Sequence, residues 1–510
     1  MVRWSIFPLL GCAAWAQGPG DVEAVVATDL GTFDVSLDAG FATVSSSTSY
    51  TSQSSSSQYD LTGLLESLSA YYGNYPRMLS PIEITSTDKA FTEELRFVSK
   101  KSGPFDWVAG AYYSQRKQTL DQYETIAGFG SWSQLPGSGV PAGCLVTNAT
   151  CYATFGEYIS GVNFGINPKN LSNPDLNFTL DRHVTFTDSA LFFEPSYHFT
   201  DKWQATAGGR IFWQNYKQSL TQDLPTSTGV FSTSNAKGFR NQIFKVNTSY
   251  EIAQHTLVYV TWSEGFRRGG VNALPLGGCY YCETPALETY KPDEARNTEI
   301  GVKGSLGAGS NYTVTLYNID WSNPQIEANT VLGGFGFVTN GVAARSRGFE
   351  AELGLPLSET TKLQLGYGYT DAKLTAGFSA GVVPDLVGVS GDRLPNVSKQ
   401  QATAALSYEQ PLAGDRDFRA RIDASYRSDF WTALAHSPTA VNLPGFVLLN
   451  ARAGVGFGKA WRIDAYMNNI TNREATTSVS TVPGPAHDRA YFVGRPRSVG
   501  LELNYSFKDH

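Results

Sequence analysis

The chain lacks long apolar runs, has few histidines, and carries no excess of positive charge. No apolar stretch reaches the roughly 18 residues that a spanning helix needs, which argues against a helical membrane protein. The 6 His are scattered, and neither an HExxH motif nor a P-loop occurs. A formal net charge of -7 argues against a nucleic-acid partner.

Two glycine-containing motifs resemble catalytic or phosphate-binding signatures but lack their context. Gly377–Gly381 matches G-x-S-x-G, yet a nucleophile elbow needs a following helix, and this copy lies in a predicted long loop. No helical pattern follows the Gly-rich stretch Gly333–Phe337, so a phosphate loop is not expected. The sequence therefore predicts no enzyme, no cofactor and no metal site.

The chain is instead rich in aromatic residues and glycine, with 26 Tyr, 29 Phe, 10 Trp and 50 Gly. Its mean hydropathy is only -0.22. In Ser498–Phe507 the apolar side chains of Val499, Leu501 and Leu503 alternate with polar or small residues, so one face of the predicted strand is apolar and the other wet. The same alternation recurs in segments 203–213, 362–370, 418–427, 447–455 and 461–467.

This recurrence favours a barrel in a lipid bilayer, because only every second residue of a barrel strand meets lipid. A soluble sandwich would alternate too, but it would bury the apolar face between two sheets, and long amphipathic strands make it the weaker interpretation. Pro195 interrupts the pattern and predicts a bulge or a strand edge, since proline donates no ladder hydrogen bond.

The connections between these segments alternate between short and long. Thr200–Lys202 and Pro411–Asp415 are short, whereas Gln118–His183, Ser219–Lys237 and Arg267–Pro292 are long. Short periplasmic turns and long extracellular loops are typical of outer-membrane barrels. We predict an all-β, antiparallel transmembrane β-barrel of about 16 strands whose last strand ends in the periplasm.

The N-terminus resembles an export signal. Arg3 precedes a short apolar stretch, and Ala14-Trp15-Ala16 offers a small-x-small cleavage site. We predict a signal peptide over residues 1–16 and a barrel over residues 17–510. The alternatives are a lipoprotein site at Cys12, which a barrel does not need, and an incidental stretch after an internal start.

The other four cysteines form two local pairs, Cys144 with Cys151 and Cys279 with Cys282. Local pairs in loop-like sequence suit disulfides in an oxidising exterior. The spacing of Cys279 and Cys282 also occurs in zinc sites. However, a structural zinc site needs about four ligands, and no further ligand lies nearby in sequence, so disulfides are favoured.

Several stretches resemble, in order along the chain, the barrel of TonB-dependent outer-membrane receptors. They are Gly40–Tyr50, Tyr75–Met78, Phe91–Ser99, Phe105–Tyr112, Ser263–Asn272, Asn297–Gly304, Ala344–Glu350, Asn468–Asn472 and Gly494–Ser498. The resemblance covers Thr32–Phe507. It implies a place in the bacterial outer membrane, contact with outer-membrane lipid, and folding by the barrel assembly machinery.

The chain departs from the family in two ways. The stretch before Thr32 is too short for the N-terminal plug and its TonB-binding box, so a plug domain is expected to be absent. The family barrel has about 22 strands, and fewer are predicted here. The chain could be a truncated form, one half of a split receptor, or a smaller reclosed barrel.

The resemblance implies a receptor for TonB-linked uptake of a nutrient such as a siderophore–iron chelate or an oligosaccharide. Without its own plug, the chain would engage the TonB system only through a plug supplied separately. The alternatives are a passive plugless pore and a surface scaffold or adhesin without transport.

Ligand contacts are expected from the extracellular loops and the upper lumen. The candidate residues are Arg267, Arg268, Trp132, Tyr280 and Tyr281. Arginine forks suit carboxylate or phosphate groups, and aromatic faces suit sugars or catecholate-like rings.

Overall fold

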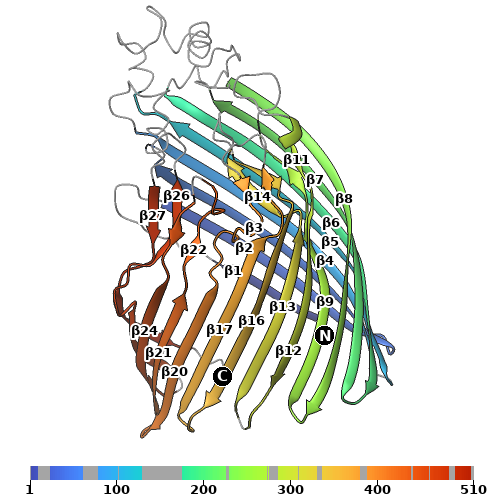
Figure 1. The fold of residues 1–510 in the computed structure, drawn as a ribbon, viewed down its shortest axis with the longest axis vertical. Helices are drawn as coiled ribbons and strands as arrows, with labels where there is room; N and C mark the ends of the chain where they lie inside the picture. Colours follow the sequence, from blue (N-terminus) through green and yellow to red (C-terminus); the bar gives the residue numbers. More distant parts are fainter. Residues whose placement is uncertain are drawn as a thin grey trace, which may run out of the picture.

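The computed structural model describes most of the chain, with gaps mainly in the predicted loops. The described residues are 2–9, 23–60, 62, 79–100, 103–128, 175–224, 229–272, 274, 285–307, 309–329, 336–379, 387–437, 440–458, 460–481 and 489–506. Most of them form one curved antiparallel sheet that bends around a lumen (Figure 1). Among these residues, no helix is both long and apolar enough to cross a membrane.

The sheet has 18 strands, somewhat more than the predicted number. In spatial order, its first nine strands are β1 (Val2–Leu9), β2 (Glu23–Asp38), β3 (Ala42–Asp60), β4 (Pro81–Ser99), β5 (Phe105–Thr125), β6 (Leu176–Thr200), β7 (Trp203–Leu224), β8 (Gly229–Ala253) and β9 (Thr256–Arg267). The other nine are β12 (Asp293–Gly304), β13 (Asn311–Ser322), β16 (Ala343–Pro356), β17 (Thr361–Leu374), β20 (Gln400–Leu412), β21 (Arg416–Arg427), β24 (Phe446–Phe457), β25 (Trp461–Asn468) and β28 (Ser498–Tyr505).

Five small hairpins lie in the connections between the sheet strands of the second half of the chain. They are β10 (Gly270–Val271) with β11 (Thr289–Tyr290), β14 (Gln325–Asn329) with β15 (Gly336–Asn340), β18 (Phe378–Ser379) with β19 (Val387–Gly388), β22 (Phe430–Trp431) with β23 (Asn442–Leu443), and β26 (Thr476–Thr481) with β27 (Arg489–Val493). A short 3-10 helix, η1 (Pro285–Leu287), precedes β11. The connections in the second half of the chain therefore contain secondary structure of their own.

The strands alternate as predicted. Val499, Leu501 and Leu503 of β28 and Ile463 of β25 are exposed on the outer face, while Asp464 faces the lumen and is buried. Aromatic side chains border this outer apolar band, as they do at bilayer interfaces. They include Tyr113, Trp213 and Tyr426 at one border and Phe199, Trp203, Tyr250, Tyr408, Trp461 and Tyr505 at the other.

Two predicted details are corrected. The predicted long loop Ser219–Lys237 is wrong, because β7 continues to Leu224 and β8 starts at Gly229. The upper parts of β7 and β8 run beyond the outer apolar band and carry polar side chains on both faces. No apolar–polar alternation in the sequence therefore indicated a strand there. Pro195 neither shifts the register nor ends a strand; the pairing of β6 with β7 skips Glu194 and Pro195 and then resumes in the same register.

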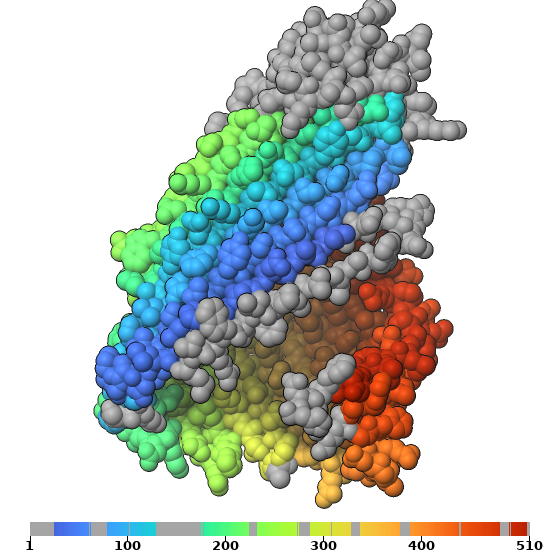
Figure 2. Space-filling model, turned by 180° about the vertical axis from the view of Figure 1, so that it is seen from behind, coloured from blue at the N-terminus to red at the C-terminus, as the bar shows by residue number. Residues whose placement is uncertain are grey.

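Among the described residues, the first and last strands of the sheet are not paired with each other. Within the described residues, β28 pairs with β25 alone, and β1 pairs with β2 alone. From behind, the N-terminal strands (blue) and the C-terminal strands (red) stand apart, and the inner surface of the opposite wall is visible between them (Figure 2). Strand β1 lies inside the segment predicted as a signal peptide, which remains a prediction.

Candidate functional site

An arginine and an aromatic ring meet on the lumen side where β9 leaves the sheet. The guanidinium carbon of Arg268 lies 3.8 Å from the ring centroid of Phe186 on β6. Its Nη1 lies 3.1 Å from Oδ2 of Asp188, and the other oxygen of Asp188 accepts a hydrogen bond of 2.8 Å from Gln214 Nε2. The arginine is two-thirds buried, so aromatic stacking and one carboxylate hold its fork in place.

Further aromatic and apolar residues surround this pair. The rings of Phe186 and Tyr216 of β7 meet edge to face at 5.0 Å. Tyr216 also forms a buried cluster with Val184 and Val271, against which Phe186 and Phe239 pack. The lumen wall here therefore holds a packed aromatic cluster beside a fixed cation.

Tyr290 of β11 completes the cluster from the loop side. Burial raises the pKa of Tyr290, and the positive charges of Arg268 and Arg182 lower it in part. The Nε of Arg182 is buried and has no hydrogen-bond partner in the described part of the chain. We call Arg182, Phe186, Tyr216, Arg268 and Tyr290 the arginine–aromatic site.

The two glycines after Arg268 allow β11 to approach. A Cβ at Gly269 would lie 2.5 Å from the carbonyl oxygen of Tyr290, and a Cβ at Gly270 would collide with the Tyr290 phenol. The Arg-Arg-Gly-Gly sequence is thus explained locally: one arginine faces the site, and the glycines let the hairpin close over it.

Arg267 has a different setting from its neighbour. Asp293, which is 1% exposed, accepts hydrogen bonds from the Arg267 backbone N–H (3.0 Å) and from its side-chain Nε (2.8 Å) and Nη2 (2.5 Å). The same carboxylate accepts bonds from Trp321 Nε1 (3.0 Å) and the Gln325 backbone N–H (3.2 Å). This Asp293 node ties β9, β12 and β13 to the β14 hairpin, so Arg267 has a structural role in addition to its predicted ligand contact.

Asn272 fastens the same loops to one another. Its side-chain amide donates to the carbonyls of Leu287 (2.6 Å) and Val338 (2.8 Å), and its Oδ1 accepts from the Val338 N–H (2.8 Å). Strands β10 and β15 and helix η1 are therefore held together by one buried side chain.

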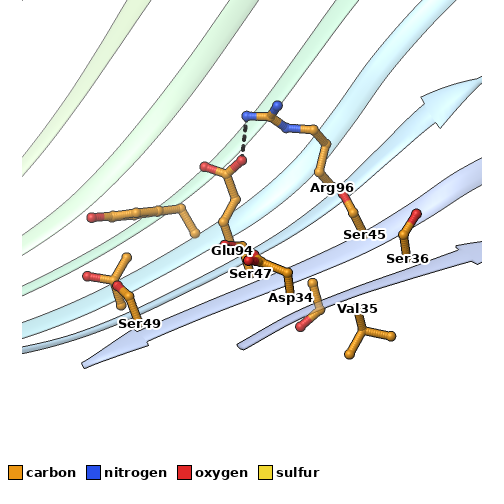
Figure 3. A pocket seen from close by; sticks show the side chains of 11 residues that line it. Asp34, Val35, Ser36, Ser45, Ser47, Ser49, Glu94 and Arg96 are labelled. Carbon is orange, nitrogen blue, oxygen red and sulfur yellow. Dashed lines mark hydrogen bonds and ion pairs between the residues drawn. The ribbon is translucent and has the colours of Figure 1, made fainter. Parts of the chain in front are cut away.

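A separate hollow of about 630 Å³ lies along the lumen side of β2–β5 (Figure 3). Its lining is rich in hydroxyls, including Ser36, Ser45, Ser47 and Ser49. Arg96 reaches along its own strand to Glu94 at 2.6 Å, as the dashed line marks. Of the charged residues that line the hollow, Arg96 pairs with Glu94, and Asp34 accepts a hydrogen bond of 2.6 Å from the Ser47 hydroxyl.

Several predicted site residues lie outside the described residues. They are Trp132, Tyr280, Tyr281, Cys144, Cys151, Cys279 and Cys282, whose ligand-binding and disulfide roles remain predictions. In the part of the chain that the structure does describe, no group of three or more His, Cys, Asp or Glu side chains is placed to hold a metal ion.

Sequence reasoning missed four members of the arginine–aromatic site. Arg182 lies in a segment that was predicted as a loop, although it shares one face of β6 with Val184 and Phe186. The spacing of these three side chains at every second position was the available signal for a strand. The approach of Tyr290 to Arg268 had no signal in the sequence, because it depends on how the hairpin folds back.

Comparison with known proteins gives a consistent picture. Residues 14–470 match the family model described as TonB dependent receptor-like, beta-barrel. The metal-pseudopaline receptor CntO of Pseudomonas aeruginosa is 23% identical over 351 residues, which cover 64% of this chain and 42% of that protein.

Two solved structures share the fold at low identity. The ferric yersiniabactin uptake receptor FyuA from Yersinia pestis superimposes with a TM-score of 0.71 at 12% identity, covering 97% of this chain and 63% of that one. The copper transporter OprC gives a TM-score of 0.66 at 12% identity, with coverage of 95% and 66%. The chain thus spans less than two thirds of the length of CntO and of FyuA.

Proposed function

Because the chain belongs to the TonB-dependent receptor-like β-barrel family, we propose that it forms the wall of a receptor for uptake of a small metal chelate. Like the barrels of its family, which consists of transport receptors and not enzymes, it lies in the bacterial outer membrane. In this proposal the TonB system drives uptake.

The arginine–aromatic site is the observation that carries the proposal. Arg268 and Arg182 provide cationic forks that suit carboxylate or catecholate oxygens of a chelating ligand. The half-buried rings of Phe186 and Tyr290 suit its planar parts. An oligosaccharide would use the rings but would offer the two guanidiniums no anionic group, so a chelate is favoured over a sugar.

The names of related proteins support the same ligand class. CntO is named as a receptor for metal-pseudopaline, and FyuA as an uptake receptor for ferric yersiniabactin. Both names describe a metal held by an organic chelator. The identities are low, so the resemblance supports the class and does not identify the chelator.

Binding to the purified chain in detergent tests this proposal. The probe is the ferric complex of 2,3-dihydroxybenzoate, followed by quenching of tryptophan fluorescence, with maltohexaose as the uncharged contrast. We expect saturable binding of the ferric complex and about tenfold weaker binding in Arg268→Gln, the loss of one charge-assisted contact.

Arg347→Gln is the control away from the site, because Arg347 lies on the same outer face of β16 as Phe349 and, in the described structure, hydrogen bonds only to Asn318. Equal binding by all three proteins, or tighter binding of maltohexaose, would overturn the chelate assignment. Steady conductance in planar bilayers without ligand binding would favour a passive pore. Neither conductance nor binding would leave a surface scaffold.

A further inference from the structure

Four cations stand on the outer face of strands β4 to β8, just above the apolar band. All four are exposed, and they are Lys89 of β4, Lys117 of β5, Lys217 of β7 and Arg240 of β8. Each lies an even number of residues from an exposed aromatic side chain lower on its own strand, so both sets share the outer face. These aromatic residues are Phe91, Tyr113, Trp213 and Phe244. We call the four cations the cation belt.

The height of the belt matches the headgroup layer of a membrane. On β7 the outer apolar band runs from Trp203 to Trp213. Ten residues of strand span about 33 Å, which a tilt of about 45° turns into about 23 Å of height, close to the apolar band of outer-membrane barrels. Lys217 lies four residues beyond Trp213, so its side chain emerges roughly 9 Å above the aromatic border, at the level of lipid headgroups.

Strand register, and not sequence, brings the lysines together. Lys89 lies directly opposite Lys117. Thr185 of β6 pairs with Lys117 on one side and with Lys217 on the other, so three lysines and one hydroxyl stand in one row across four strands. Like charges directly opposite each other destabilise a strand pair. The row therefore carries a cost that an anion bound from outside would remove.

The carboxylates nearest in sequence do not neutralise the belt. Asp88, which precedes Lys89, points into the lumen and pairs there with Arg116. On the outer face, Glu93 lies four residues below Lys89, about 13 Å along the strand, and accepts hydrogen bonds from two hydroxyls of β3 instead. No belt cation takes part in the ion pairs of β4 to β8 in the described part of the chain.

The outer cations of β16 and β17 are arranged differently. Arg345 pairs with Asp320 at 2.5 Å, and Lys373 pairs with Asp371 at 2.9 Å. Arg347, which lies on the same face, hydrogen bonds to an asparagine. Two of these three cations are therefore neutralised within the protein, whereas the belt presents its charge to the surroundings on one side of the barrel.

Hydroxyl groups lie directly above the lysine row. Thr87 and Thr119 are opposite each other, one outer-face position above Lys89 and Lys117, and their hydroxyl oxygens are 2.6 Å apart. Ser219 has the corresponding place above Lys217 on β7. Ammonium and guanidinium groups bind phosphate, and hydroxyls exchange hydrogen bonds with sugars. The surface therefore offers partners for phosphate with partners for sugar above them.

We propose that the cation belt binds the phosphate groups of a phosphorylated glycolipid in the outer leaflet of the membrane. The acyl chains of this lipid lie against the apolar band, its phosphates meet the belt, and its sugars face the hydroxyl row. The lipid is thus held on the wall formed by β4 to β8. Neither the arginine–aromatic site nor the nutrient that the receptor takes up enters this assignment.

Native mass spectrometry of the purified chain in neutral detergent tests the assignment. The probes are lipid A with two phosphates, lipid A with one phosphate, and phosphatidylcholine, each titrated at 0.1 M salt. We expect the lipid with two phosphates to bind most tightly. One cation at a charged membrane surface contributes about fivefold, so Lys89→Gln/Lys117→Gln/Lys217→Gln should weaken this binding roughly thirty- to hundredfold.

The matched control is Arg345→Gln/Arg347→Gln/Lys373→Gln, which removes the same number of positive charges from the outer face of β16 and β17. Its binding should fall by less than about threefold. The variant with arginine at positions 89, 117 and 217 keeps the charges and should bind like the wild type. Retention of the heat-modifiable band on unheated SDS gels shows that a variant is folded. Lys117→Gln alone, with an expected loss of about fivefold, replaces the triple variant if the latter lacks this band.

Three results would overturn the proposal. Equal losses in the two triple glutamine variants would show that net charge alone governs binding. Phosphatidylcholine that binds as tightly as lipid A with two phosphates would show that the acyl chains suffice. Displacement of bound lipid A by an equal concentration of inorganic phosphate would show that the belt takes free phosphate and not a lipid headgroup.

Discussion

The early wall of the barrel, β3 to β8, and the late wall, β9 to β28, reach the extracellular side in different ways. Strands β3 to β8 are 19 to 25 residues long, whereas β9 and the later wall strands have 8 to 14. The early wall rises above the apolar band by extending its strands. The late wall stops near the band and continues as five separate hairpins held by buried side chains such as Asp293 and Asn272 (Figure 1).

The difference shows two ways of stabilising structure above a membrane. A long strand keeps its backbone groups paired with its neighbours, so its side chains are free to be polar. A short hairpin has few ladder bonds of its own and depends on side chains that reach across from other elements. Single substitutions should therefore disturb the late wall more than the early wall.

The largest contrast is expected for charge placed on the outer faces. Leu316→Arg, on the apolar band of β13, should lower the free energy of unfolding by about 2–4 kcal/mol, because it puts a cation in hydrocarbon. Ser54→Arg, on the polar upper part of β3, should change it little. Urea unfolding in lipid vesicles measures both, and similar losses would show that β3 is embedded as deeply as β13.

The next contrast concerns two carboxylates. Asp293→Ala should destabilise the late wall by roughly 2–3 kcal/mol, because Trp321 Nε1 and the Gln325 N–H lose their acceptor. Asp88→Ala, which removes a more exposed pair with Arg116 on the early wall, should cost less than about 1 kcal/mol. Urea unfolding followed by tryptophan fluorescence gives both values; the reverse order would refute the comparison.

A smaller, local effect is expected at Asn272. Asn272→Ala should open β14–β15 by about 1–2 kcal/mol while leaving the strands of the sheet intact, because the amide bonds loops and not the ladder. Hydrogen exchange should accelerate at residues 336–340. Unchanged exchange there would mean that β14–β15 is held by its own pairing.

The smallest effect concerns pH. Burial raises the pKa of Tyr290 above its ordinary value of 10.0. The folded chain then keeps a proton that the unfolded chain releases, so this contribution to stability is present below pH 10 and lost as the pH rises above it. Unfolding of wild type and Tyr290→Phe at pH 9 and pH 11 should show a smaller alkaline loss in the variant; identical losses would contradict burial of the phenol.

How far the sequence could predict the structure depends on whether each strand has an apolar face. The segment predicted at 418–427 is β21 at Arg416–Arg427, and the one at 461–467 is β25 at Trp461–Asn468. The upper halves of β7 and β8 were predicted as a loop, because polar residues on both faces leave no period to detect. Of the arginine–aromatic site only Arg268 was predicted, since Arg268 and Phe186 are far apart in sequence.

By itself, the sequence determined which face of each strand meets lipid and which meets water, because alternation is a local property of the chain. Only the tertiary structure decided which charges meet and how the hairpins close over Arg268. These depend on strand register and on the number of strands around the lumen, and neither quantity is encoded in any single segment.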